Sequence, residues 1–307
     1  MKKNKFPVIF LLSFLLGIGV CPANAQDHAW WAANVGWDGK AHWSTYIISM
    51  PRYLGPNALP VPELSKGQVA ERSSLGWEGQ VHFMKGDHTW NAVLRGVYSI
   101  APGKVSVEAL WIPVEYAVVS HALKTERRIF HLFYNQRWAT GDVYIQTNLQ
   151  LLQATPNKPG LMLRMGQRLP ASNMQGAARF TDAPGFYLDL STGIPLSGAW
   201  RLSLMSGVFI WQTNRDDQFQ NDAFLFGLGA TRSFGPWGLD LGFRGYLGYM
   251  GKGDDPLAAN ARVSYARKGW QWQMGFQQGF LDLRYVSFQT GVVKLLPLRH
   301  YSMQRAN

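Results

Sequence analysis

The stretch from Asp222 to Phe276 constrains the fold most, because apolar and polar residues alternate along it in four ribbons. One face is apolar and aromatic, as in Trp270, Trp272 and Met274, whereas the other is small, amide or charged. Strict alternation with a period of two predicts β-strands. A soluble sandwich turns such an apolar face inward, and an outer-membrane barrel turns it toward lipid. Alternation alone leaves both folds open.

The connectors between the predicted strands distinguish the two folds. Alternation from Ser74 onward predicts about twelve strands, with ten or fourteen as alternatives. The connectors after the third, fifth, seventh and ninth strands are long and polar, including 114–140, 169–184 and 211–221, and most of the others are tight. Long external loops and short periplasmic turns are typical of barrels. We therefore predict an all-β chain that forms a transmembrane antiparallel up-and-down β-barrel, with both termini in the periplasm.

Residues 1–25 have the pattern of a secretory signal peptide. Lys2, Lys3 and Lys5 precede an apolar run over 6–20, and Ala23-Asn24-Ala25 fits the cleavage rule. A lipoprotein signal that uses Cys21 is the alternative. On the first interpretation the mature chain begins near Gln26 and contains no cysteine. No later run of about 20 apolar residues predicts a transmembrane helix.

The next segment, 26–72, differs from the rest of the chain. It is rich in tryptophan and contains the run 50–62, whose four prolines exclude a central strand. The segment is interpreted either as an extended periplasmic leader or as a plug inside the barrel. Residues 73–293 are then the barrel, and 294–307 form a basic C-terminal tail.

Charge narrows the expected partners. The formal net charge is +11, and loss of the three signal lysines leaves +8 without any dense run of Lys or Arg. Together with export, this argues against nucleic acid as a partner. Outer-membrane lipid and lipopolysaccharide are the expected surroundings, and a small-molecule solute is the expected cargo. The sequence does not identify a protein partner.

Aromatic residues fall near the ends of the predicted strands, where amphipathic rings form girdles at the lipid headgroups. The predicted girdle comprises Trp77, Trp90, Tyr98, Trp111, Trp200, Trp211, Phe234, Trp237, Tyr249, Tyr265 and Trp270.

The opposite face predicts the lumen wall. The predicted lumen residues are Glu78, His82, Arg95, Glu108, Arg164, Arg168, Asp189, Arg201, Asp240, Arg244, Arg262, Asp282 and Arg284. Neighbouring strands present opposite charges, including Arg284 beside Glu78 across the closing seam. Such charges either form structural ion pairs in a narrow lumen or attract anions in a wider one. Because about twelve strands leave little free bore, we expect a narrow or gated passage.

The central third of the chain resembles a known family. Residues 140–152 (TGDVYIQTNLQLL), 159–170 (PGLMLRMGQRLP) and 185–193 (GFYLDLSTG) resemble the outer-membrane proteins of the meta-pathway phenol-degradation family, distant relatives of FadL-type hydrocarbon transporters. The resemblance implies an outer-membrane barrel that passes small apolar or aromatic compounds. Residues 56–59 (PNAL) depart from the Asn-Pro-Ala hatch motif of the FadL type, so a hatch is not implied.

Motifs for enzymatic chemistry are weak. Ser120 and His121 are adjacent, with His131 nearby, but there is no Gly-x-Ser-x-Gly element. The acid pairs at 216–217 and 254–255 suit solvated loops better than calcium sites, and the histidines lack metal-ligand spacing. We predict no cofactor, no metal and no enzymatic activity.

The sequence thus leads to one main hypothesis and two alternatives, the last of which is minor. The first is a narrow passage for small solutes through an outer-membrane barrel. The second is a structural barrel whose loops or leader dock a partner. The third is an outer-membrane lipid-modifying enzyme that uses Ser120 and His121.

Overall fold

The computed structural model describes residues 29–46, 48–128, 136–155, 158–173, 179, 184–196, 199–215, 218–251 and 253–297. Helical structure in these ranges is limited to α2 (Ala29–Val35), η1 (Trp43–Tyr46), η2 (Pro51–Tyr53) and α3 (His121–Glu126). The strands are β1 (Ser74–Met84), β2 (Asp87–Ala101), β3 (Val105–Val119), β4 (Gln136–Ala139), β5 (Val143–Leu152), β6 (Gly160–Leu169), β7 (Gly185–Pro195), β8 (Trp200–Arg215), β9 (Gln218–Phe234), β10 (Trp237–Gly248), β11 (Pro256–Arg267), β12 (Trp270–Leu281) and β13 (Tyr285–Leu295).

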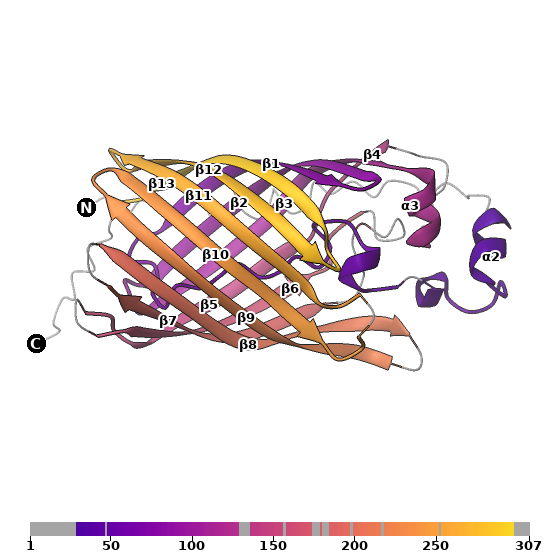
Figure 1. Cartoon of the computed structure of the whole chain (residues 1–307), viewed down its shortest axis with the longest axis horizontal. Helices are drawn as coiled ribbons and strands as arrows, with labels where there is room; N and C mark the ends of the chain where they lie inside the picture. The colour runs from indigo at the N-terminus through magenta and orange to yellow at the C-terminus, as the bar shows by residue number, and fades with distance from the viewer. Residues whose placement is uncertain are drawn as a thin grey trace, which may run out of the picture.

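Twelve of these strands close into an antiparallel barrel (Figure 1). Each strand of the wall pairs with its neighbour in sequence, apart from β4. The short β4 strand pairs only with β3, and the next wall strand after β3 is β5. At the closing seam Glu78 of β1 lies opposite Val93 of β2 and Gly291 of β13. Closure leaves no unpaired edge along the wall. The predicted fold class and strand number are confirmed.

The barrel is inverted in polarity relative to a soluble protein. Large apolar side chains such as Leu75, Trp77, Met274 and Phe288 are exposed on the outside, whereas His82 and Asp189 are buried inside. Lipid is the solvent that stabilises such an outer surface, and inter-strand hydrogen bonds satisfy the backbone. The barrel is therefore transmembrane. Among the described residues, no helix is both long enough and apolar enough to cross a membrane.

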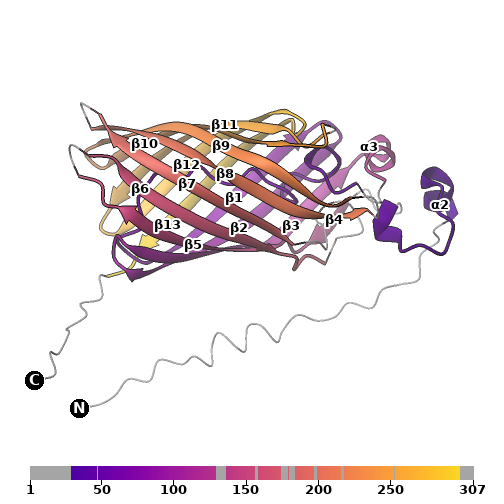
Figure 2. The same ribbon diagram turned by 90° about the horizontal axis from the view of Figure 1, so that it is seen from below.

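The connectors differ between the two ends of the barrel. One end, called the turn end, carries the connectors 102–104, 153–159, 196–199, 235–236 and 268–269, between consecutive strands. The other, called the loop end, carries the two longest connectors, 120–142 and 170–184, together with 85–86, 216–217, 249–255 and 282–284, and α3 lies there (Figures 1 and 2).

The prediction of a long loop over 211–221 is wrong. The β8 strand continues to Arg215 and β9 begins at Gln218, and Trp211 pairs with Asn221 in this extension. Backbone pairing therefore persists where polar side chains had suggested a loop. Trp211 is also not a girdle residue, because its side chain is fully buried inside the barrel.

The N-terminal segment 29–72 runs through the barrel from the loop end to the turn end. Its α2 helix lies outside the loop end near α3 (Figure 1), and the backbone N–H of Arg52 donates to the carbonyl oxygen of Gly253 in a loop-end connector (3.2 Å). Near the other end, the N–H of Gly103 in a tight turn donates to the carbonyl oxygen of Ala70 (3.3 Å).

The prediction placed both termini on the same side of the membrane. Both chain ends lie outside the described residues, so this stays a prediction. Among the described residues, α2 lies at the loop end and β13 finishes at the turn end with Leu295. The strand thus extends past the predicted barrel boundary at 293. The proposed signal peptide, and the tail after 297, lie outside the described residues.

Candidate functional site

Most of the predicted lumen residues do face the interior. Alternation places them on one side of each strand, and the barrel turns that side inward. Those with interior contacts are Glu78, His82, Arg95, Glu108, Arg164, Arg168, Asp189, Arg201, Asp240, Arg244 and Arg262.

Asp282 and Arg284 are exceptions and correct the prediction. Both lie in the connector between β12 and β13 at the loop end, where Arg284 is exposed and Asp282 accepts the backbone N–H of Asp255 (3.0 Å). The strand ends at Leu281, which has a positive φ of 55°. In β13 the inward residues are odd-numbered, as buried Ser287 shows, so the predicted parity was also reversed. Arg284 therefore does not meet Glu78.

The lumen contains a plug, defined here as residues 50–68. This run is proline-rich, and each proline lacks an N–H group that burial would otherwise leave without a partner. The carbonyl groups that remain bind the wall: Tyr246 O–H donates to the carbonyl oxygen of Leu59 (2.9 Å), and Tyr144 O–H to that of Asn57 (3.4 Å). Wall side chains thus hold a segment that, after the short η2 helix, has no regular secondary structure.

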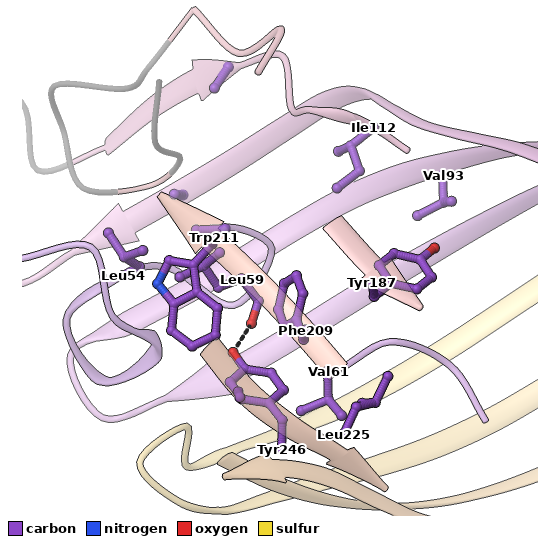
Figure 3. Packing of buried hydrophobic residues seen from close by; sticks show 14 of the residues in the cluster. Leu54, Leu59, Val61, Val93, Ile112, Tyr187, Phe209, Trp211, Leu225 and Tyr246 are labelled. Carbon is purple, nitrogen blue, oxygen red and sulfur yellow. Dashed lines mark hydrogen bonds between the residues drawn. The ribbon is translucent and has the colours of Figure 1, made fainter. Parts of the chain in front are cut away.

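An apolar seal closes the lumen toward the loop end. Plug residues Leu54 and Leu59 are buried against Phe209, Trp211 and Tyr246 of the wall (Figure 3). The rings of Phe209 and Tyr246 meet edge to face with centroids 5.0 Å apart, a favourable aromatic geometry. The indole N–H of Trp211 donates to the carbonyl oxygen of Ser49 at 2.8 Å. In this conformation a packed apolar layer fills the lumen at this level.

A buried ion network lies beside the seal at the loop end. Asp87 accepts hydrogen bonds from Arg127 (2.5 Å) and Arg179, and Arg179 also binds Glu115 (2.8 Å). The plug joins this network, because the side-chain amide of Asn57 donates to Glu115. The side chains of Asp87 and Arg127 are both 0% exposed. Buried charges require such pairing, so the network fixes α3 and the plug to the wall.

The middle of the lumen is a cavity of about 300 Å³ between the plug and the wall, lined by both polar and apolar side chains. Its lining includes charged, amide and tyrosine side chains, among them Glu63, Lys66, Arg95, Glu108, Gln146, Asn148, Arg164, Arg244, Gln277, Tyr285 and Gln289. Glu63 and Arg95 form an ion pair of 2.6 Å, and their side chains are 41% and 31% exposed. Lys66 of the plug likewise pairs with Asp240 of β10. The charged side chains of the central lumen are therefore partly accessible to solvent, in contrast to the buried apolar seal.

The charges around Glu63 set its ionisation. Partial removal from water raises the pKa of this carboxyl, but Arg95, Arg262 and Arg244 outweigh that effect and hold the pKa below its usual range. Glu63 belongs to the plug and not to a membrane-spanning strand. It is therefore a fixed negative charge inside the lumen at neutral pH.

Several interior residues escaped the sequence prediction. Glu63 and Lys66 lie in an irregular segment, where alternation gives no orientation. Asp87, Glu115 and Asp142 lie at or beyond the predicted strand ends, and Asp142 pairs with Arg168 (2.8 Å). Arg127 belongs to the connector 114–140, whose polar sequence predicts a loop and not a buried side chain. The one sequence feature that could have indicated these interior residues is the grouping of acidic residues and arginines at the strand ends.

The residues considered for enzymatic chemistry make hydrogen bonds that stabilise the local fold. The hydroxyl of Ser120 accepts the N–H of Leu123 (3.3 Å) and so caps α3, the role that serine commonly has at this position. Asp254 accepts hydrogen bonds from Asn221 and Met250. Within the described residues no cluster of histidine, cysteine or carboxylate side chains has the arrangement of a metal site. His131 and the acids at 216–217 lie outside the described residues.

No family of known proteins matches the sequence, and no curated protein is similar to it in sequence. The fold, however, is similar to that of an outer membrane channel from Pseudomonas putida F1, with 13% identity, a TM-score of 0.54, and coverage of 78% of this chain and 97% of that one. The NanC porin (10% identity, TM-score 0.49, 72% and 100% coverage) and the KdgM porin (8%, 0.46, 73% and 99%) are more distant.

The similarity to the Pseudomonas channel concerns the fold alone, and it agrees with the closed barrel, the outward apolar face and the central lumen described above. The class defined by these features is a transmembrane β-barrel of the outer-membrane type. The FadL-type relationship implied by the sequence resemblance stays a prediction.

Proposed function

We propose that this protein is a narrow, gated passage for small solutes across the outer membrane. The observation that carries the proposal is the contrast along the lumen between a cavity with charged lining and an apolar seal in which the plug residues Leu54 and Leu59 pack against the wall. The plug is continuous with β1 but is not a strand of the wall. Its movement would therefore join the cavity to the loop end without opening the barrel.

The proposed orientation places the turn end in the periplasm and the loop end outside the cell, as is typical of such barrels. Outer-membrane phospholipid and lipopolysaccharide are then the lipid partners of the apolar outer face. In this orientation the plug is held on the external side by the buried Asp87 network, and the cavity lies toward the periplasm.

The lining supports small polar or charged solutes as cargo. Amide side chains such as Gln277 and Gln289, together with ion pairs, replace the hydrogen bonds that a solute loses on leaving water. The lining also contains the aromatic side chains Tyr144, Tyr187, Phe209 and Tyr285 and aliphatic side chains, so the apolar or aromatic solutes implied by the family resemblance are the alternative cargo.

A single glycine offers a test of the plug. Gly67 has a φ of +69°, and a Cβ at this position would lie 2.2 Å from the backbone nitrogen of Gly193 in β7. Gly67→Val therefore prevents the plug from seating, while the wall keeps its composition. We expect the full-length variant in planar lipid bilayers to show frequent open events where the wild type is mostly closed.

Gly39→Val is the matched control, because Gly39 has a φ of +74° but has nothing within 4 Å of the added Cβ. It imposes similar backbone strain without the clash and should stay closed. Retention of heat-modifiable mobility in gels shows that each barrel has folded. Folded Gly67→Val barrels that pass no ions or small solutes would contradict a passage function.

A further inference from the structure

Glu63 occupies a cluster of arginines inside the lumen. Its carboxylate accepts a hydrogen bond from Arg95 at 2.6 Å, and Arg244 and Arg262 contribute the other nearby positive charges. These arginines come from β2, β10 and β11, so that different parts of the wall converge on one carboxylate of the plug.

The acids of the wall satisfy these arginines only weakly. Arg95 lies 4.0 Å from Glu108, and Arg262 lies 3.9 Å from Glu78, both at the limit of an ion pair. The short contact of Arg95 is made by the plug and not by the wall. Asp240, which lies opposite Arg262 in the β10–β11 ladder, pairs instead with Lys66 of the plug. While the plug is seated, the wall acids therefore neutralise this arginine cluster only partly.

Arg244 gives a second and independent indication of a ligand site. It is 8% exposed and lines the cavity, and its Nε has no hydrogen-bond partner among the described residues. Its Nη2 makes a 3.3 Å hydrogen bond to the Gln277 side chain. A buried guanidinium with an unused donor favours a bound anion, because leaving such a donor unpaired is costly.

We propose that this cluster is a binding site for small organic carboxylates, and that Glu63 is a tethered carboxylate that fills it when the plug is seated. A carboxylate solute competes with Glu63 for Arg95 and Arg244 and so loosens the plug. This inference rests on the proposed function and names both the solute class and the opening signal. The cavity of about 300 Å³ next to the cluster matches the lower size range of small-molecule sites, and Gln277 and Tyr285 there suit solute hydroxyl groups.

Competition should be visible directly as binding. Lactate is the probe and lactamide, which has the same shape without the charge, is its neutral counterpart. In calorimetry on detergent-solubilised full-length protein, Glu63→Gln should bind lactate at least about fivefold more tightly than the wild type, because the competitor is gone. The double variant Glu63→Gln/Arg95→Gln should lose this gain in lactate affinity. Lactamide should not bind the wild type, Glu63→Gln or the double variant. Equal lactate affinity in wild type and Glu63→Gln would overturn the proposal.

Gating gives the second readout. In bilayers, lactate on the turn-end side should raise the open probability of the wild type about fivefold or more, and lactamide should not. Glu63→Gln should be more open at rest and insensitive to lactate. Glu71→Gln is the matched control, because Glu71 is an exposed acid of the same segment outside the cavity, and it should behave as the wild type.

The outcomes separate this inference from the passage function. If Gly67→Val conducts but lactate neither binds nor opens the wild type, the passage stands and the carboxylate site is wrong. If folded Gly67→Val and Glu63→Gln barrels both fail to conduct, the passage function itself is wrong.

Discussion

The phenol of Tyr246 on β10 donates a 2.9 Å hydrogen bond to the carbonyl oxygen of Leu59 in the plug, and both residues are buried (Figure 3). This bond links the wall to a segment 187 residues away in sequence, in the middle of the apolar seal. It satisfies a backbone group that has no strand or helix partner. The seated plug is therefore sensitive to one hydroxyl group of the wall.

Tyr246→Phe should loosen the plug without disturbing the barrel. The variant keeps the ring and its packing but leaves the Leu59 carbonyl group buried without a donor, which costs about 1–3 kcal/mol. Since about 1.4 kcal/mol corresponds to a tenfold change in an equilibrium, the open-to-closed ratio in single-channel recordings should rise about tenfold. Tyr98→Phe, on the exposed outer face, is the control. No change in that ratio would show that the bond does not hold the plug.

Asp87→Asn should destabilise the whole barrel. The change leaves Arg127 buried without its carboxylate and Arg179 with only Glu115. Removal of one member of a buried charge network costs about 3–5 kcal/mol. Urea unfolding of protein refolded into lipid vesicles measures this loss. Asp222→Asn, at an exposed acid, should change the unfolding free energy little, and equal effects of the two variants would contradict a structural role for the network.

The plug should remain seated in mild acid. Burial raises the pKa of Glu63, but the surrounding arginines outweigh this effect and lower the pKa below the ordinary 4.5. A lowered pKa means that the stabilising contribution is complete above the ordinary value and is lost only as the pH falls through the lower, folded value. Open probability should therefore stay constant from neutral pH down to 4.5 and rise only below it.

Glu63→Gln should abolish that acid-induced rise, because it removes the titrating group. An increase in wild-type open probability already above pH 4.5 would contradict the depressed pKa. A rise that persists unchanged in Glu63→Gln would assign the acid response to another group.

Arginine substitutions on the two faces of β12 should distinguish the face that contacts lipid from the face that lines the lumen. Met274 is 71% exposed on the outer face, so Met274→Arg places a charge in lipid and should destabilise the barrel by up to about 2–4 kcal/mol, the cost of an arginine at the bilayer midplane. Gln273, the adjacent residue, faces Glu78 in the lumen at 2.9 Å, and Gln273→Arg gains an acidic neighbour. Unfolding titrations in vesicles should show a large loss only for Met274→Arg. Similar losses for both would contradict the assignment of the faces.

Much of the wall was predictable because a strand fixes side-chain direction by parity alone. Arg95, Arg164, Asp240 and Arg244 were all placed in the lumen correctly on that basis. The rule failed at Asp282 and Arg284, where a positive φ at Leu281 ends one strand and the next begins with the opposite parity. It also failed at Trp211, since an aromatic residue near a strand end is equally suited to a lipid girdle or to an interior seal.

The sequence by itself determined the barrel, its approximate strand number and the polarity of its two faces, because alternation is local and each strand carries it independently. The tertiary structure decided what fills the lumen. Residues 50–68 have no periodicity, and their positions depend on contacts with wall residues such as Tyr246 and Arg95 that are distant in sequence. Only closure of the barrel brings Glu63 to the arginines of three strands, and this physical proximity creates the site from which the proposed gating follows.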